Sequence, residues 1–77
     1  MTYKEHILDC FADGSEDAVQ VKSMLELVGI FMEREQIEIL INELVDEGMV
    51  SIDDSCLGEG GAMYKMTESG SKAWELL

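Results

Sequence analysis

The chain has 77 residues, of which 17 are Asp or Glu and 5 are Lys or Arg, so its net charge is −12 at pH 7. This length predicts one small domain over residues 1–77 and excludes a second core. The charge repels nucleic acid and anionic membranes, and it favours a basic protein surface or a cation as the partner. Periodic apolar residues argue against the disorder that such a charge can cause.

The two cysteines, Cys10 and Cys56, form neither a CxxC pair nor the disulfide framework of a small secreted domain. This usage favours a reducing, intracellular compartment. The first residues lack a basic region followed by an apolar run, and no stretch approaches the ~18 apolar residues of a membrane span. We therefore predict a soluble cytoplasmic protein without a membrane partner.

The first predicted element is a helix that Thr2 caps. Its core-facing side chains share one sector at about 100° per residue, and they are Tyr3, Ile7, Cys10 and Phe11. Residues 13–17 are predicted to form a turn. The β-branched run at residues 18–21 predicts a short edge strand before the next helix.

Two helices are predicted to follow, over residues 21–28 and within residues 32–48. The apolar residues of the first have the helical spacing of three and four, and they are Val21, Met24, Leu25 and Val28. The buried stripe of the second consists of Ile37, Leu40, Ile41 and Leu44, with Val45 at its margin. Gly29 and Gly48 follow the two helices at positions that favour a left-handed residue.

A β-hairpin and a last helix complete the predicted order. Residues 49–53 alternate apolar and polar side chains, residues 55–61 form a glycine-containing loop, and residues 62–66 return as a second strand. Thr67 can cap the last helix. One face of that helix carries a small pair that permits close approach and a large aromatic, and its residues are Gly70, Ala73, Trp74 and Leu77.

Two junctions carry a resemblance to a known family. LINELVDEGMVSIDD, with LVxxGMV at residues 44–50, resembles the end of the recognition helix and the first wing strand of MarR-like and PadR-like regulators. AMYKMTESGSKAWELL, with YKMTxxG at residues 64–70, resembles their second wing strand and the helix after it. The resemblance covers nearly the whole chain. It implies an α+β, mostly helical winged helix-turn-helix domain with a three-helix core, a β-hairpin wing and a C-terminal helix.

DNA-binding members of this family insert the third helix into the major groove, and their wing carries basic residues to the backbone. This chain departs from that pattern at both places. Residues 32–48 hold six carboxylates and one arginine, and the wing loop holds Glu59 without Lys or Arg. A carboxylate about 7 Å from a phosphate costs on the order of 0.6 kcal/mol in water. Four or five of them, each facing several phosphates, would cancel a non-specific affinity of roughly 5 to 8 kcal/mol. This argues against nucleic acid as a partner.

We therefore predict a non-enzymatic domain that acts through protein–protein interaction in a regulatory context. Its partner would have a basic or apolar-basic surface, and a variant is that the acidic face imitates nucleic acid. The residues predicted to make the contact lie on the outer side of the third helix, and they are Glu35, Glu38, Ile39, Asn42 and Glu43. Residues 30–32 join Ile39 as an apolar centre, or Ile30 and Phe31 are core residues and Ile39 is a single exposed isoleucine. A second surface at Leu57, Ala62 and Met63 is better explained by burial beneath the wing.

The alternative function is a DNA-binding transcriptional regulator. Its basic residues would be Lys4, Lys22, Arg34, Lys65 and Lys72. They are scattered in the sequence, so this function requires the fold or a dimer to gather them on one face. A homodimer would use an exposed Trp74 or residues 30–32, and the sequence leaves the oligomeric state open.

No catalytic, cofactor or metal site is predicted. The acidic turns, one at Asp13, Ser15 and Asp17 and one at Asp53, Asp54 and Glu59, do not match a calcium loop. His6 and Cys10 are one turn apart and could contact one metal, but two ligands do not make a site. The glycines at 58, 60 and 61 lie in a hairpin and not between a strand and a helix, so they do not form a phosphate loop.

Overall fold

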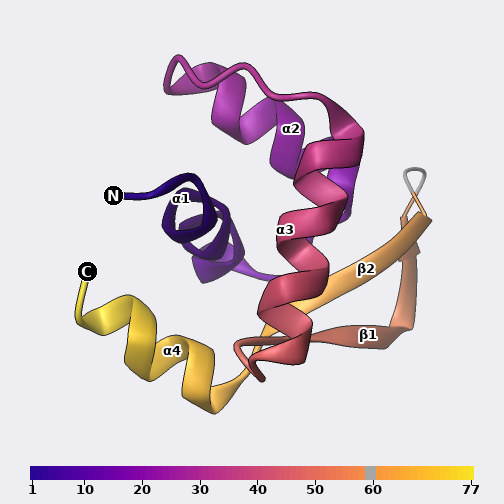
Figure 1. The fold of residues 1–77 in the computed structure, drawn as a ribbon. Helices are drawn as coiled ribbons and strands as arrows, with labels where there is room; N and C mark the ends of the chain where they lie inside the picture. Colours follow the sequence, from indigo (N-terminus) through magenta and orange to yellow (C-terminus); the bar gives the residue numbers. More distant parts are fainter. Residues whose placement is uncertain (59–60) are drawn as a thin grey trace.

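The computed structural model describes the backbone of residues 1–58 and 61–77 and the side chains of residues 1–53 and 61–77. The elements in chain order are α1 (Tyr3–Cys10), the short 3-10 helix η1 (Phe11–Asp13), α2 (Ala18–Leu27), α3 (Arg34–Asp46), β1 (Val50–Gly58), β2 (Gly61–Met66) and α4 (Glu68–Glu75). Figure 1 shows the hairpin on one side of α3, with both termini on the opposite side of the molecule. The predicted winged-helix architecture, with three core helices, a hairpin and a C-terminal helix, is confirmed.

The core lies among α1, α2 and α3 and reaches the first residue of β1. Its buried apolar residues are Ile7, Leu8, Cys10, Phe11, Ala18, Val21, Leu25, Met32, Ile37, Ile41, Leu44 and Val50. The stripe predicted for α3 is confirmed, with Leu40 and Val45 half-buried at its edges. On α1 the prediction is partly wrong, because Tyr3 is 60% exposed and Leu8 is buried. Leu8 is covered because α4 packs against α1, a contact that the pattern of α1 alone does not encode.

The prediction of a strand over residues 18–21 is wrong, and so is the predicted start of the second helix. These residues form the first turn of α2, which runs from Ala18 to Leu27. Asp17 caps this helix by accepting a hydrogen bond from the Gln20 N–H at 2.8 Å. In return the Asp17 N–H donates to Gln20 Oε1 at 2.8 Å. This reciprocal capping satisfies two N–H groups at the helix start and outweighs the strand preference of Val19 and Val21.

The strand-like contact occurs instead in the turn before α2. Glu16 and Tyr64 form an isolated antiparallel bridge, with the Glu16 N–H donating to the Tyr64 carbonyl at 3.0 Å and the Tyr64 N–H donating to the Glu16 carbonyl at 2.9 Å. The Ser15 hydroxyl also donates to Asp53 of β1 at 2.5 Å. The turn is therefore tied to both strands of the hairpin.

The hairpin is longer than predicted. β1 and β2 pair antiparallel from Val50 opposite Met66 to Gly58 opposite Gly61, with a shift in register between Ile52 and Leu57. The loop predicted over residues 55–61 is wrong in extent, because β1 continues to Gly58. The register shift interrupts the alternation of apolar and polar residues on which the strand prediction rests. Glu59, named for the acidic wing, lies outside the described residues.

α4 is held at its start by Thr67, which confirms the predicted cap. The Thr67 hydroxyl accepts from the Gly70 N–H at 3.0 Å and donates to the Gly48 carbonyl at 2.5 Å. At its other end the Trp74 Nε1–H donates to Asp9 of α1 at 2.7 Å. Gly48 has a φ of 78°, which is the left-handed conformation predicted for the end of the third helix. None of the described helices is long and apolar enough to span a membrane.

Replacing Thr67 with valine is expected to lower the free energy of unfolding by about 1 to 2 kcal/mol, because the side chain keeps its shape and loses both hydrogen bonds. Urea denaturation followed by circular dichroism measures this change. Thr67→Ser is the control, since it keeps the hydroxyl and should stay within about 0.5 kcal/mol of the unchanged protein. A valine variant as stable as the serine variant would show that the cap does not stabilise α4.

Candidate interaction surface on the third helix

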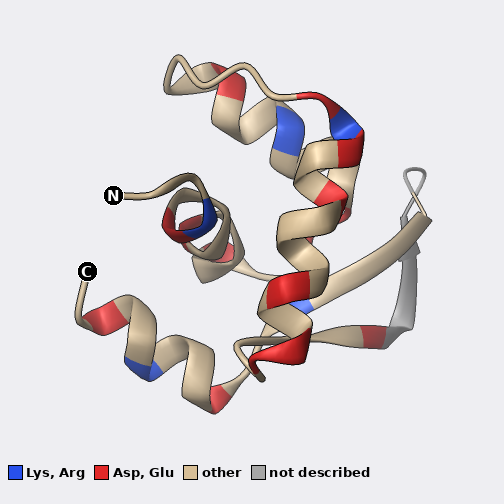
Figure 2. Ribbon diagram, viewed as in Figure 1, with Lys and Arg blue, Asp and Glu red and all other residues tan. Residues whose placement is uncertain are grey.

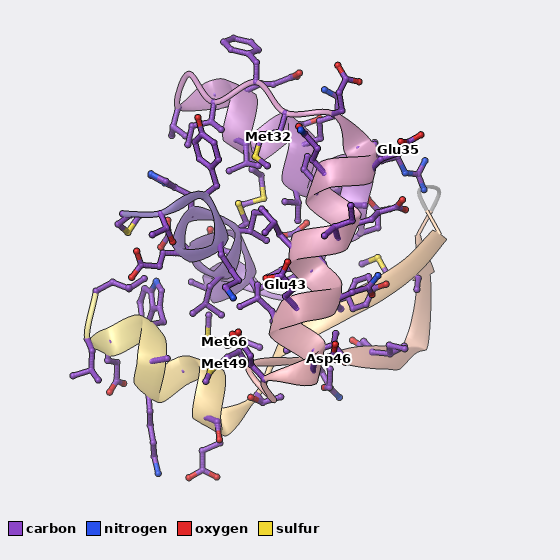
Figure 3. The ribbon with its side chains drawn as sticks, in the orientation of Figure 1. Met32, Glu35, Glu43, Asp46, Met49 and Met66 are labelled. Carbon is purple, nitrogen blue, oxygen red and sulfur yellow. The ribbon has the colours of Figure 1, made fainter. Side chains whose placement is uncertain are left out.

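The five residues predicted to bind a partner are all exposed on α3, and we call this set of Glu35, Glu38, Ile39, Asn42 and Glu43 the α3 face. At about 100° per residue the set divides around the helix. Glu38 and Asn42 lie toward the wing, as does Arg34, whose guanidinium lies 3.8 Å from where a Cβ on Gly61 would be. Glu43 lies toward α1 (Figure 3). The surface is therefore continuous along α3 but has two sides with different neighbours.

The basic residues do not form a ridge. They lie on five different elements, α1, α2, α3, β2 and α4, and acidic positions separate them (Figure 2). Four of the five pair with carboxylates among the described residues, through Lys4 to Glu43 and Glu47, Lys22 to Glu26, Arg34 to Glu38, and Lys72 to Glu68. Lys65 is exposed on β2. The alternative function, a DNA-binding regulator, requires the basic residues to gather on one face. The single chain does not meet this requirement.

Lys4 makes the ion pairs that join α1 to α3. Its Nζ lies 2.7 Å from Glu47 Oε2 and 3.3 Å from Glu43 Oε1. The hydrogen bond to Glu47 raises the pKa of Lys4 above its ordinary value, because it favours the charged ammonium. Exposed pairs of this kind contribute little to stability. The main consequence is that Lys4, the cation beside the α3 face, is already paired with carboxylates.

The apolar residues near α3 divide between core and surface. Met32 is 8% exposed and belongs to the core, Ile30 is half-buried, and Phe31 and Ile39 are 77% and 58% exposed. The interpretation of Ile30 and Phe31 as core residues is thus wrong for Phe31, and Met32, expected in the exposed apolar centre, is buried instead. On the wing, Ala62 is exposed and Met63 half-buried, so burial beneath the wing is wrong for Ala62. The Leu57 side chain lies outside the described residues.

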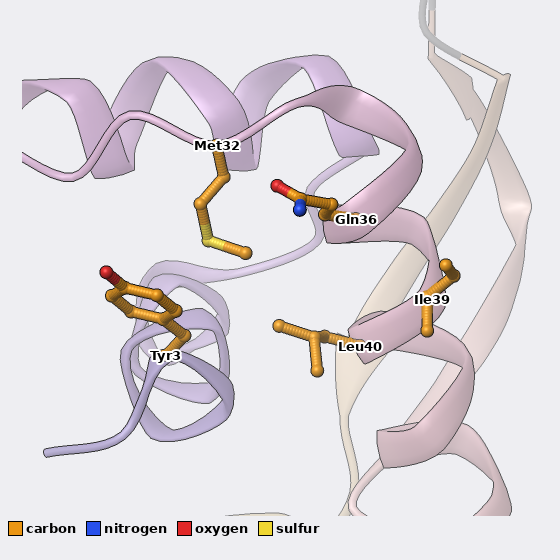
Figure 4. A pocket seen from close by; sticks show the side chains of 5 residues that line it. All are labelled: Tyr3, Met32, Gln36, Ile39 and Leu40. Carbon is orange, nitrogen blue, oxygen red and sulfur yellow. The ribbon is translucent and has the colours of Figure 1, made fainter.

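A groove between α1 and the start of α3 was not predicted. Its volume is about 310 Å³, and its lining consists of Tyr3, Met32, Gln36, Ile39 and Leu40 (Figure 4). The sequence pattern predicted that Ile39 is exposed and that Tyr3 and Leu40 are core residues. The helical spacing of Gln36 and Leu40 placed them on one side of α3, and nothing local showed that Tyr3 lies opposite them.

His6 and Cys10 do not form part of a metal site in the described residues, where no three His, Cys, Asp or Glu side chains are grouped to hold an ion. Cys10 is 6% exposed. Burial, aided by the charge of Asp9, raises the pKa of its thiol to about 11. The thiolate that a metal or a nucleophilic reaction requires is therefore scarce at neutral pH.

Cys10 is expected to react at least about 100-fold more slowly with a disulfide reagent in the folded protein than in denaturant at pH 8. About one thiol in a thousand is then ionised with a pKa of about 11, against about one in four for an unfolded cysteine. Because the folded-state pKa is raised, this thiol stabilises the fold below the unfolded pKa, and that contribution is lost as the pH rises toward 11. The assay uses a Cys56→Ser background, and equal rates in both states would contradict the burial.

No protein-family model matches this chain, and no curated protein matches its sequence. The fold does match solved structures. Bacillus subtilis PadR in complex with operator DNA has a TM-score of 0.78 and 22% identity over 94% of this chain and 44% of the PadR chain. RosR from H. salinarum has a TM-score of 0.79 and 19% identity over 97% of this chain and 68% of its own. The oxidised form of MarR from E. coli has a TM-score of 0.73 and 19% identity, over 95% and 48% of the two chains.

These matches define the class of fold. The chain has the winged helix-turn-helix fold, as its two wing junctions predicted. It is similar to PadR, RosR and MarR, which are transcription regulators, and it spans less than half the length of PadR and MarR. An identity of 18–22% supports the fold alone.

Proposed function

We propose that this chain acts in transcription regulation, as a winged-helix domain whose α3 face contacts a basic or apolar-basic protein surface. The regulatory setting is supported by the structural neighbours. The choice of a protein partner is supported by one observation, the exposed carboxylates Glu35, Glu38 and Glu43 around exposed Ile39 on the helix that lies beside the wing. A cytoplasmic location belongs to this proposal.

The chemistry of the α3 face suits such a contact. Exposed apolar area surrounded by charge is the composition of an interface with a dry centre and a polar rim. A net charge of −12 steers a basic partner toward the domain and raises the association rate. The same charge opposes a phosphate backbone, because the described cations near α3, Lys4 and Arg34, already pair with carboxylates.

A second candidate is a DNA-binding transcriptional regulator. The observation that favours it is the match to PadR, which is seen with operator DNA, over 94% of this chain. The comparisons support this function better than they support protein contact, since the neighbours are regulators and none is described with a protein partner. For this chain, binding would require a second copy or bound cations to offset the carboxylates of α3.

Fluorescence anisotropy with a mixed-sequence duplex of about 30 base pairs, at 20 to 200 mM salt, distinguishes the two functions. Affinity that falls steeply as salt rises would support the DNA regulator and overturn the protein-contact proposal. The proposal expects no binding at 10 µM protein, about the weakest affinity the assay resolves. It also expects crosslinking of a basic protein in native cells that is lost when the α3 face is changed to alanine.

A homodimer is compatible with either function. The two surfaces named for it, Trp74 and Phe31, are 36% and 77% exposed in the single chain. Light scattering across a range of concentrations measures the oligomeric state, and Phe31→Ser and Trp74→Ser identify which surface carries it.

A further inference from the structure

We propose that the groove between α1 and α3 receives apolar side chains from a basic amphipathic helix of another protein. This inference rests on the proposed protein-contact function and names the class of partner. The groove is lined by Tyr3, Met32, Gln36, Ile39 and Leu40, and Figure 4 shows Tyr3 facing Leu40 and Gln36 across it.

The groove has an apolar floor and open apolar rims. Met32 is 8% exposed and forms the floor with half-buried Leu40. Tyr3 and Ile39 are 60% and 58% exposed and form the two rims. A volume of about 310 Å³ lies at the small end of the range of roughly 300 to 1,000 Å³ for ligand sites. It therefore suits two or three side chains from one face of a helix, and the helix itself would lie across the rims.

Charge complementarity selects a basic helix. Glu43 lies one turn after Ile39 and toward α1, beside the groove, whereas Glu35 lies one turn before Ile39 and its side chain extends on the wing side of α3 (Figure 3). Glu43 shares Lys4 with Glu47, while Glu35 forms no ion pair with a cation in the described part of the chain. Lysine or arginine side chains beside the apolar stripe of the partner would meet these carboxylates. An acidic or neutral helix would bring no cation to Glu35 and would leave Glu43 with its share of Lys4.

Gln36 is the polar side chain that lines the groove, and it can donate a hydrogen bond to such a partner. Gln36 Oε1 accepts a hydrogen bond from the Glu33 N–H at 3.4 Å, which turns the Nε2 amide group into a donor for an incoming chain. The groove also lies on the α1 side of α3, whereas Glu38 and Asn42 lie toward the wing. Docking in the groove can therefore be separated from contacts made by the wing side of α3.

The test titrates the ¹⁵N-labelled 77-residue chain with a 14-residue helical peptide of leucine and lysine, with leucines spaced three and four apart. A peptide of the same composition with its leucines dispersed is the control ligand. We expect amide shifts at the five lining residues and at least tenfold weaker binding of the control peptide. Tyr3→Ser combined with Ile39→Asn should weaken the first peptide at least tenfold. The matched control is Ile52→Asn, which changes an isoleucine of similar exposure, 52%, on the wing and should leave the affinity unchanged.

The outcomes distinguish failure of the groove proposal from failure of the protein-contact proposal. Equal affinity for both peptides, or shifts confined to Glu38, Asn42 and the wing, would overturn the groove while protein contact through α3 stands. Concentration-dependent shifts at the groove without peptide would show that a second copy of the chain occupies it, and would overturn the proposal. Absence of binding by either peptide, together with salt-sensitive binding of the duplex, would overturn both.

Discussion

Replacing Gly70 with alanine is expected to destabilise the protein by about 3 kcal/mol, although alanine is the better helix former by about 1 kcal/mol. Gly70 is buried in the first turn of α4. A Cβ built on it would lie 1.9 Å from the carbonyl oxygen of Met49 and 2.8 Å from its carbonyl carbon. These are backbone atoms that enter β1, so α4 must move away from the hairpin to make room. Gly70→Val enlarges the clash and is expected to prevent folding.

Thermal unfolding followed by circular dichroism measures this effect, and for a domain of this size about 3 kcal/mol corresponds to a fall in Tm of roughly 12 to 24 °C. The matched control is Ser69→Ala, an exposed position in the same helical turn. It should leave Tm unchanged or slightly raised, since alanine favours the helix. An alanine at position 70 that raises Tm as well would show that α4 does not contact Met49 as closely as described.

Reversing three carboxylates of the α3 face is expected to create DNA affinity. Each change from Glu to Lys at positions 35, 38 and 43 removes a repulsion of about 0.6 kcal/mol and adds a similar attraction, for one phosphate at about 7 Å in water. The three together correspond to roughly 100-fold or more. The reversal also removes Glu38 as a partner of Arg34 and releases Lys4 from one of its carboxylates. Anisotropy with the mixed-sequence duplex should show binding whose logarithmic salt dependence is steeper by about 2.7.

The control reverses the same number of charges elsewhere, at exposed Glu26, Glu68 and Glu75 on α2 and α4. We expect a much smaller gain from it, because these residues lie away from α3. Equal gains from both triple variants would mean that net charge alone governs DNA affinity, and that the α3 face is not placed as a recognition helix. A large gain confined to the α3 variant would identify its carboxylates as the barrier to DNA.

Most of the fold was predictable because its determinants are local. The spacing of Ile37, Ile41 and Leu44 defines the buried stripe of α3 within one helix. Gly29 and Gly48, with φ values of 83° and 78°, mark the ends of α2 and α3. Thr67 lies next to the helix that it caps. Each signal spans only a few residues, so sequence patterns recover it.

Most of the wrong predictions concern residues whose burial depends on contacts between distant parts of the chain. Leu8 is buried because α4 covers it, and Tyr3 is exposed because it stands at the rim of a groove that α1 forms with α3. For residues 18–21 the deciding signal is local, because the reciprocal capping by Asp17 and Gln20 outweighs the β-branched residues that predict a strand. The end of β1 depends on a register shift that has no counterpart in the alternation of residues.

The candidate surface was predictable only in part. Periodicity correctly placed the five residues of the α3 face on the exposed side of the helix. The ion pairs of Lys4 with Glu43 and Glu47 join residues 39 and 43 positions apart, so no local pattern indicates them. The groove beside Ile39 likewise requires Tyr3, which reaches it from another helix. Whether the α3 face binds a partner stays a prediction.

The backbone bridge between Glu16 and Tyr64 makes β2 the middle of a three-membered β arrangement, with the turn before α2 on its outer side. The hairpin cannot rotate relative to the helical core without breaking both N–H···O bonds. The base of the hairpin and the core should therefore move together as one rigid body. Slow amide hydrogen exchange at Glu16 and Tyr64 is the expected signature. Any molecule that docks against the wing is then presented to α3 at a fixed angle.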